Sequence, residues 1–421
     1  MSVKEKHFQK RDIQTVLKHI LLENYLVRWA KVLSNASFGT NLKRVHFVDC
    51  FAGKGTFDDG DHGSPKIASE NLFHLQGSLQ KKYEKSIKFF IHTIEAHREY
   101  YNALQSLKRQ APFPEQVSNN YGTFEEHIDN MLRKTKGYPS LFFIDPFGYK
   151  GLPMPKIQQI LNQQSHEILI NVMSYSLVRN HNIKNNQLPL KEFFGLNELN
   201  EDISEYLEIA TENNITTLQT KNLLQLEDKI IELYKSQLKK NSGEELFVLS
   251  KRIFSKLNPN VYFHLVFATK NLEGLRQMKE SMVDFEQLKI TAEDKYIRNY
   301  QLGGITVEND LFSDDVQSSS YEYRDFLNDF LSQFNNKKTS YFEFVKFYLE
   351  ETPLPFRSDV DKSIYNFMKR LSKTKSLTFL SQNNTISTIR NAKEIIFTAR
   401  LNKTLIDDLC ESDKMEQLKL F

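Results

Sequence analysis

Cysteine is scarce in this chain, because its 421 residues include only Cys50 and Cys410, which lie far apart. Their spacing matches neither a disulfide framework nor a zinc site, and this favours a reducing compartment. Long hydrophobic runs are also missing, since no segment reaches the roughly 20 apolar residues that a membrane-spanning helix needs. The charged first residues lead into no apolar core of signal-peptide length. We therefore expect a soluble, cytoplasmic protein without a membrane partner.

A strong excess of charge of one sign is lacking as well. The chain has 56 Lys and Arg against 53 Asp and Glu, which gives a net charge of +3. Any affinity for nucleic acid must therefore come from local patches and not from the overall field. Hydrophobic residues make up 40% of the chain and aromatic residues 12%. This composition provides enough material for a large core and for two domains.

The most informative segment runs from Val45 to Phe57 and reads VHFVDCFAGKGTF. An apolar strand ends at Asp49 and continues directly into a turn that contains Phe51, Gly53 and Gly55. Small residues suit a turn whose backbone a ligand approaches closely. The spacing D-x-F-x-G-x-G is neither that of a phosphate loop nor that of a dinucleotide site. Among nucleotide-like cofactors it best suits S-adenosylmethionine (SAM), although a purely structural turn has the same pattern.

Two further apolar runs end in polar residues. The segment IHTIE predicts a second buried strand that ends at Glu95, where a carboxylate can accept hydrogen bonds from a cofactor ribose. The alternative is a solvated glutamate at a strand end. The segment LFFI, which ends at Ile144, predicts a strand buried on both faces, followed by a sharp turn at Asp145, Pro146, Phe147 and Gly148.

These three motifs in this order resemble Rossmann-like methyltransferases. The tetrad Asp-Pro-Phe-Gly is similar to the [DNS]-P-P-[YFW] tetrad of amino-group methyltransferases that act on nucleic acid bases, from which it departs at Phe147 and Gly148. The tRNA guanine-N2 methyltransferases carry a similar variant. The resemblance implies that Asp145 and the Pro146 carbonyl accept hydrogen bonds from a target amine, and that Phe147 stacks on a flipped base.

The same resemblance implies further cofactor contacts. Asp49 would order the turn and contact the methionine end of SAM. A third strand and its loop are expected within 115–124, where Asn120 or Thr123 would contact the adenine. The Asp- and Gly-rich loop at 58–63 reads as a turn, so we expect no metal.

The chain also resembles the three-Cys-motif partner proteins, a bacterial family. The likeness spans about the first two-thirds of the chain and implies a three-cysteine protein, encoded nearby, as a candidate partner. It is carried by Lys18-His19 with Tyr25 and Trp29, by VDCFAGKG with Gly63-Ser64-Pro65, by FIDPFG, and by the strand Phe263–Thr269 followed by Met278 and Met282.

The predicted fold is α/β, with a Rossmann-like methyltransferase sheet in 1–310 that is interrupted by a polar helical insertion at about 183–241. That insertion could hold substrate or a partner. An acidic, Ser-rich linker occupies 310–320. Two helices, at 341–349 and 358–371, and two strands, at 377–380 and 394–398, then predict a winged helix-turn-helix domain in 316–402, with a tail at 403–421.

Positive charge is concentrated in this C-terminal domain. Between Lys337 and Arg400 there are twelve Lys and Arg against six Asp and Glu. The second helix and the residues after it would contact nucleic acid phosphates through Lys362, Lys369, Arg370, Lys373 and Lys375. The alternative is a solvated helix face in a winged helix that binds protein.

Together these features predict a SAM-dependent methyltransferase that modifies an exocyclic amine of a nucleic acid base in DNA or RNA. A second interpretation is a catalytically silent protein that keeps the methyltransferase fold and acts as a partner or DNA-binding regulator. Methylation of a partner protein fits the same cofactor site.

Overall fold

The computed structural model divides into two units, Met1–Ile305 and Thr306–Phe421, which are described separately. Before residue 300 the structure describes residues 12–58, 60–83, 87–173, 187–198, 221–240, 242, 245–255, 257 and 263–299. In the second unit it describes 323–334, 337–352, 377–380 and 394–397. None of the described helices is long and apolar enough to cross a membrane.

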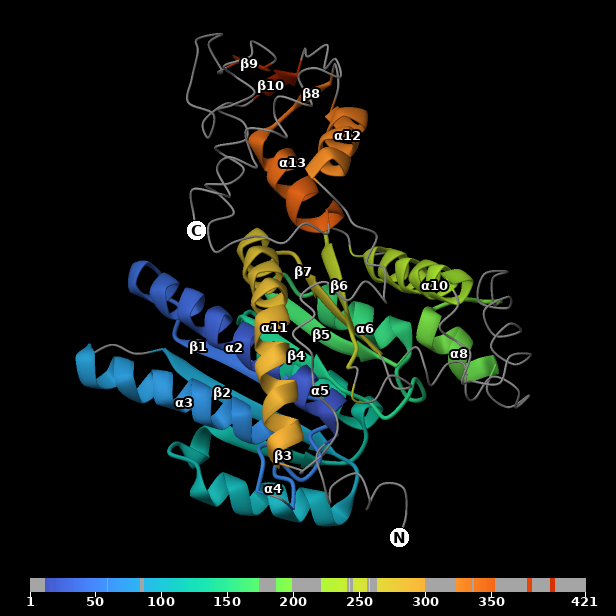
Figure 1. Ribbon diagram of the computed structural model, residues 1–421. Helices are drawn as coiled ribbons and strands as arrows, with labels where there is room; N and C mark the ends of the chain where they lie inside the picture. The colour runs from blue at the N-terminus through green and yellow to red at the C-terminus, as the bar shows by residue number, and fades with distance from the viewer. Residues whose placement is uncertain are drawn as a thin grey trace. The chain divides into compact units, whose positions relative to one another are not determined.

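The first unit is built around a seven-stranded sheet with the order β3-β2-β1-β4-β5-β7-β6 (Figure 1). Neighbouring strands are parallel except in the two pairs that contain β7. The strand order reverses between β1 and β4, which is the switch point of a doubly wound fold. The strands are β1 Arg44–Asp49, β2 Lys88–Glu95, β3 Val117–Tyr121, β4 Ser140–Ile144, β5 His166–Val172, β6 Phe247–Ile253 and β7 Phe263–Thr269.

Helices cover both faces of this sheet. On one face, α2, α3 and α11 pack together, and Leu22, Leu26 and Trp29 of α2 are buried as their helical spacing predicts. On the other face, α5, α6, α8 and α10 share a buried core with β4, β5 and β7. The helices of this unit are α2 Ile13–Gly39, α3 Ser64–Lys82, α4 Arg98–Gln110, α5 Phe124–Thr135, α6 Met154–Leu161, α8 Gln187–Phe194, α10 Lys221–Lys239 and α11 Leu272–Asn299.

The predicted α/β class and mostly parallel sheet are confirmed. The apolar runs that end at Asp49, Glu95 and Ile144 form β1, β2 and β4, which are adjacent at the centre of the sheet. Helices α8 and α10 lie within the predicted insertion, between β5 and β6. The sequence did not indicate β6, whose polar residues Ser250, Lys251 and Arg252 interrupt its apolar pattern.

The second unit contains a short antiparallel sheet with the order β8-β10-β9. Its described elements are α12 Tyr323–Phe334, β8 Lys338–Thr339, α13 Tyr341–Lys346, a π-helical turn Phe347–Glu351, β9 Leu377–Leu380 and β10 Glu394–Phe397. Buried rings of Phe330, Phe334 and Phe344 pack together between α12 and α13. The helix predicted at 358–371 lies outside the described residues, so the winged helix stays a prediction.

Candidate active site

The loop after β1 is held by short backbone contacts. Asp49 ends the strand, and its Oδ1 accepts the Phe51 N–H at 3.3 Å, which orders the turn. Gly53 and Gly55 have φ angles of 62° and 77°, a region that favours glycine. A Cβ on Gly55 would collide with the Leu107 side chain of α4. Backbone conformation and packing against α4 therefore account for glycine at position 55, and a close approach of a ligand there stays a prediction.

Glu95, the last residue of β2, joins two loops through its carboxylate. Its Oε2 accepts the Gly53 N–H at 2.8 Å, and its Oε1 accepts the His97 N–H at 2.6 Å. The Glu95 carbonyl accepts the Gly122 N–H at 3.0 Å. One residue thus fixes the ends of β1, β2 and β3 relative to one another.

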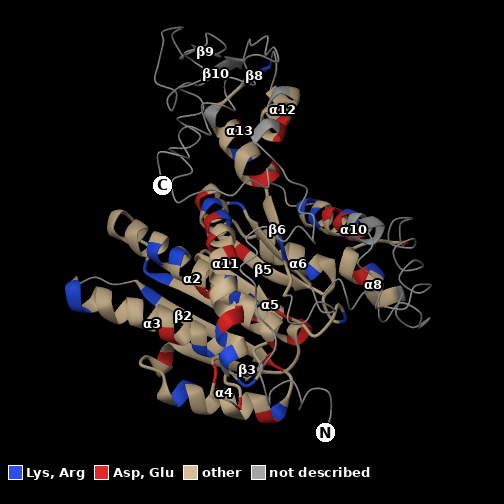
Figure 2. Ribbon diagram, viewed as in Figure 1, with Lys and Arg blue, Asp and Glu red and all other residues tan. Residues whose placement is uncertain are grey.

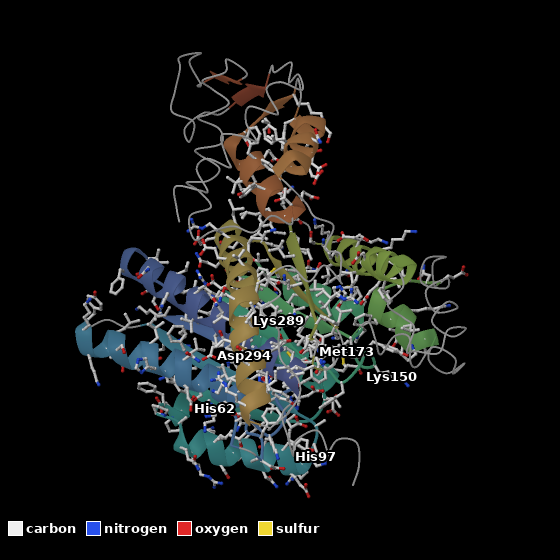
Figure 3. All side chains as sticks on the ribbon, in the orientation of Figure 1. His62, His97, Lys150, Met173, Lys289 and Asp294 are labelled. Atoms are coloured by element: carbon white, nitrogen blue, oxygen red, sulfur yellow. The ribbon has the colours of Figure 1, made fainter. Side chains whose placement is uncertain are left out.

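A cavity of about 650 Å³ opens at the carboxyl ends of β1 to β4, beside the switch point. This is the edge where doubly wound folds bind ligands, and the volume is in the range of small-molecule sites. Its wall includes the aromatic side chains of Phe51, Tyr100, Phe124 and Phe147. His97 and Lys150, which also line it, are labelled in Figure 3.

The structure divides the predicted site residues into two groups. Five line the cavity, namely Phe51, Glu95, Thr123, Pro146 and Phe147. Five others lie near it without forming its wall, namely Asp49, Gly53, Gly55, Asn120 and Asp145. The predicted phosphate contacts Lys362, Lys369, Arg370, Lys373 and Lys375 fall outside the described residues.

Asn120 and Thr123 both make structural hydrogen bonds. The Asn120 amide donates to the backbone carbonyls of Thr93, at 2.9 Å, and Ser118, at 3.2 Å. The Thr123 hydroxyl accepts the Glu126 N–H at 3.3 Å, and Glu126 Oε2 accepts the Thr123 N–H at 2.7 Å. This reciprocal pair is a capping box that starts α5. Of the two residues predicted to contact adenine, only Thr123 reaches the cavity.

Asp145 has two side-chain partners from distant parts of the chain. Its Oδ2 forms an ion pair with Lys18 of α2, and its Oδ1 accepts a hydrogen bond of 2.8 Å from the Asn171 amide. The Lys18 ammonium also lies 5.7 Å from the centre of the Phe263 ring. Both carboxylate oxygens are engaged, so a substrate amine would have to share them. Next to this partly buried group, Phe147 is 57% exposed and lines the cavity.

The buried carboxyl of Asp49 has a pKa well above the ordinary value of an aspartate. Its pKa is raised to about 7, mainly by burial and also by the charges of Asp145 and Glu95, while hydrogen bonds from Ser64 and the Phe51 N–H limit the rise. Asp49 is fully buried and does not line the cavity. Its hydrogen bond with the Phe51 N–H fits the predicted role in ordering the turn, whereas contact with the methionine end of SAM stays a prediction.

A second polar cluster lies farther along the same edge of the sheet. His264 is the second residue of β7 and pairs in register with Val172, at the end of β5. Its Nδ1 is 3.3 Å from the buried carboxylate of Glu227 on α10, which also contacts Arg252 Nη2 at 3.3 Å. Burial, together with the Arg252 charge, lowers the pKa of His264 to about 3, so the imidazole is neutral at physiological pH.

Sequence reasoning missed the partners of Asp145. A signal for Asn171 was present, because this amide interrupts an otherwise apolar end of β5 in the run ILINV. Lys18 carried a weaker signal as a charged residue on a helix whose other side is apolar. Only the fold brings these two residues, 153 positions apart in the sequence, to one carboxylate.

No protein-family model matches the chain, and no curated protein matches it. Among solved structures, the O-methyltransferase from Bacillus cereus, in complex with SAH, is 12% identical, and the match covers 62% of this chain and 91% of that chain with a TM-score of 0.29. TomG from Streptomyces achromogenes, an O-methyltransferase involved in tomaymycin synthesis, was solved in complex with SAM. It is 11% identical, and the match covers 60% of this chain and 79% of that chain with a TM-score of 0.28. Both are distant likenesses.

Proposed function

We propose that this protein is a SAM-dependent methyltransferase. The observation that carries the proposal is Glu95: a carboxylate at the end of the second strand lines the cavity and is fixed by the N–H groups of Gly53 and His97. A carboxylate at the end of the second strand of a doubly wound sheet can accept hydrogen bonds from ribose hydroxyls. The mostly parallel sheet is consistent with the Rossmann-like sheet that the resemblance to methyltransferases implies.

The cavity suits a nucleoside-like ligand with a polar tail. Its aromatic wall provides apolar surface for a purine ring, and the first residues of α5 border it. When bound, SAM supplies a methyl group on a cationic sulfur, which a nucleophile attacks in line. The protein's own contribution is to hold the acceptor at that distance and angle.

The substrate we propose is an exocyclic amine of a nucleic acid base. The exposed Phe147 ring offers a surface on which a flipped base can stack. Pro146 lines the same cavity, where its carbonyl would accept a hydrogen bond from the amine. Asp145, anchored by Lys18 and Asn171, fixes the backbone that presents both groups.

One observation favours a second function. Because Lys18 and Asn171 already occupy both Asp145 oxygens, the tetrad can serve as a structural turn in a protein that binds SAM without transferring methyl groups. Such a protein would act as a partner or regulator, and a three-cysteine protein is the partner that the family resemblance implies. Methylation of a protein substrate would use the same cavity.

Calorimetry with SAM and its demethylated product tests the cofactor. We expect Glu95→Gln, which keeps an acceptor for Gly53, to weaken binding by about 1 to 3 kcal/mol. The control is Glu99→Gln, because Glu99 in the first turn of α4 is an exposed acid that does not line the cavity, and it should change affinity little. Failure of the wild-type protein to bind SAM would refute the proposed cofactor.

A radiolabelled methyl-transfer screen over DNA, RNA and proteins then tests the substrate. We expect transfer to a nucleic acid, and Asp145→Ala should reduce turnover far more than SAM affinity. SAM binding without transfer to any nucleic acid or protein would support the silent partner instead. Transfer to protein alone would replace the proposed substrate.

A further inference from the structure

The edge of the sheet opposite the cavity is strongly basic. Crossover helices run antiparallel to the strands they connect, so α3, α4 and α5 end at the amino ends of the strands. All three helices end in positive charge, and Figure 2 shows it in blue at the far end of α3. The residues in these last turns are Lys81 and Lys82 in α3, Lys108 and Arg109 in α4, and Arg133 and Lys134 in α5.

Four more basic residues lie at this edge, in the connections or at the first positions of strands. Lys43 and Arg44 lead into β1, Lys88 opens β2, and Lys136 follows α5. We call the described residues in 40–44, 79–83, 88, 106–116 and 132–139 the basic edge. These ranges contain ten Lys and Arg and a single acid, Glu115. The chain as a whole has a net charge of only +3, so this edge is a local concentration of charge.

The charges on the basic edge are not paired. None of the ten side chains forms an ion pair with a carboxylate in the described part of the chain, whereas Lys54, Lys156 and Lys251 elsewhere do. Stabilisation of helix dipoles explains part of the pattern, because cations are favourable at helix carboxyl ends. It does not explain Lys43, Arg44 and Lys88, and α2 and α6 end without basic residues.

Aromatic rings lie among these charges. Phe38 and Tyr83 are 54% and 39% exposed, and their ring centres are 4.8 Å apart. The Lys82 ammonium is 5.1 Å from the centre of the Tyr83 ring. Arg44 lies over the Phe90 ring at 5.8 Å. Rings beside unpaired cations form the surface on which nucleic acid backbones and bases are held.

We propose that the basic edge is a docking surface for the phosphate backbone of a nucleic acid, separate from the cavity. The basic edge and the cavity lie at opposite ends of the strands, and a strand as long as β2 spans about 25 Å. The basic edge would therefore hold a different part of the polymer from any base in the cavity. An anionic membrane is the less favoured partner, because such surfaces insert aliphatic side chains as well as rings. Among described residues, no exposed large aliphatic side chain lies on the basic edge.

Salt-dependent binding of the full chain to a labelled duplex of about 20 base pairs tests this surface. Each phosphate contact contributes about 0.9 to the slope of log affinity against log salt, so the variant K81A/K82A/K88A should lower that slope by about 2 to 3 units. At about 50 mM salt we expect at least roughly tenfold weaker binding. The control K31A/K240A/K295A removes three exposed lysines from α2, from α10's end and from α11, and should leave the slope unchanged.

Circular dichroism and thermal melting establish that each variant is folded, and K108A/R109A, on a different helix, provides a second test. SAM affinity should be the same in all of them, which separates this proposal from the cofactor site. Equal slopes for the wild type and both basic-edge variants would overturn the proposal. The proposal would also be overturned if the basic-edge variants bound phosphatidylserine vesicles more weakly than the wild type but bound nucleic acid equally well. That result would make the partner a lipid surface.

Discussion

Lys18 of α2 and Asp145, which follows β4, form an ion pair in which both side chains are largely buried. The pair connects the opening helix to the residue that begins the Asp-Pro-Phe-Gly turn. Asn171 holds the other carboxylate oxygen, so the geometry of this turn depends on three segments of the chain.

Lys18→Met should destabilise the protein because it leaves the Asp145 carboxylate without its counter-charge. Breaking a buried pair from one side costs about 3 to 5 kcal/mol, and the partial exposure of Asp145 places the expected loss at about 2 to 4 kcal/mol. Urea denaturation measures it. The double variant K18M/D145N should recover much of the loss, and a double variant no more stable than K18M would mean that the pair contributes little.

Gly53→Val should abolish SAM binding. Its φ of 62° is strained for a β-branched residue by about 1 to 3 kcal/mol, and relief of that strain would move the N–H away from Glu95. Calorimetry measures the binding. Gly77→Ala in α3 is the control, because a Cβ there has no atom within 4 Å. The control variant should raise the free energy of unfolding by up to about 1 kcal/mol and leave SAM affinity unchanged. Normal SAM affinity in Gly53→Val would show that this loop does not take part in SAM binding.

Asp49 makes stability fall as pH rises. The folded protein holds a proton on this carboxyl up to about pH 7, whereas the unfolded chain loses it near its ordinary pKa of 3.8, so the folded state binds more protons between these values. Between about pH 5 and pH 8 the loss is roughly 2 to 3 kcal/mol. Denaturation of wild type and Asp49→Asn at both pH values measures it. The free energy of unfolding of Asp49→Asn should not fall over this pH range. If the wild type and the variant showed the same pH dependence, Asp49 would not be the group responsible.

The C-terminal unit should contribute its own salt-dependent affinity for nucleic acid if the winged-helix prediction is right. Changing Lys369 and Arg370 together to Ala in the full chain should lower the salt slope for duplex DNA by up to about 2 units. This loss should add to that of the basic-edge variants, because different phosphates are contacted. An unchanged slope would indicate a winged helix that binds protein.

The sequence predicted the central strands well because each is a buried apolar run with a polar residue at its end. It could not predict that Asp145 would meet Lys18, since that contact depends on how α2 crosses the sheet. Thr123 carries a second signal besides its predicted adenine contact. The spacing of Thr123 and Glu126 is that of a capping box, and this local rule predicts a helix start, which the structure has.

The positive charge of the basic edge could not be predicted from the sequence. Counted along the chain, the basic residues of the first unit are dispersed, and only the C-terminal region stands out as positive. The fold gathers Lys43, Lys82, Lys108 and Lys134 at one edge, because three crossover helices end there. A linear count cannot detect a patch that is assembled from segments about 100 residues apart.

The hydrogen bonds that Ile94 and Glu95 accept from the loop after β1 have a dynamic consequence. The Ala52 N–H donates to the Ile94 carbonyl at 3.1 Å, and the Gly53 N–H donates to the Glu95 side chain. These amides continue the hydrogen bonding of the sheet beyond the end of β1, so they should exchange with deuterium as slowly as strand amides, even before a ligand binds. The floor of the cavity is then rigid in advance, and binding there costs little conformational entropy.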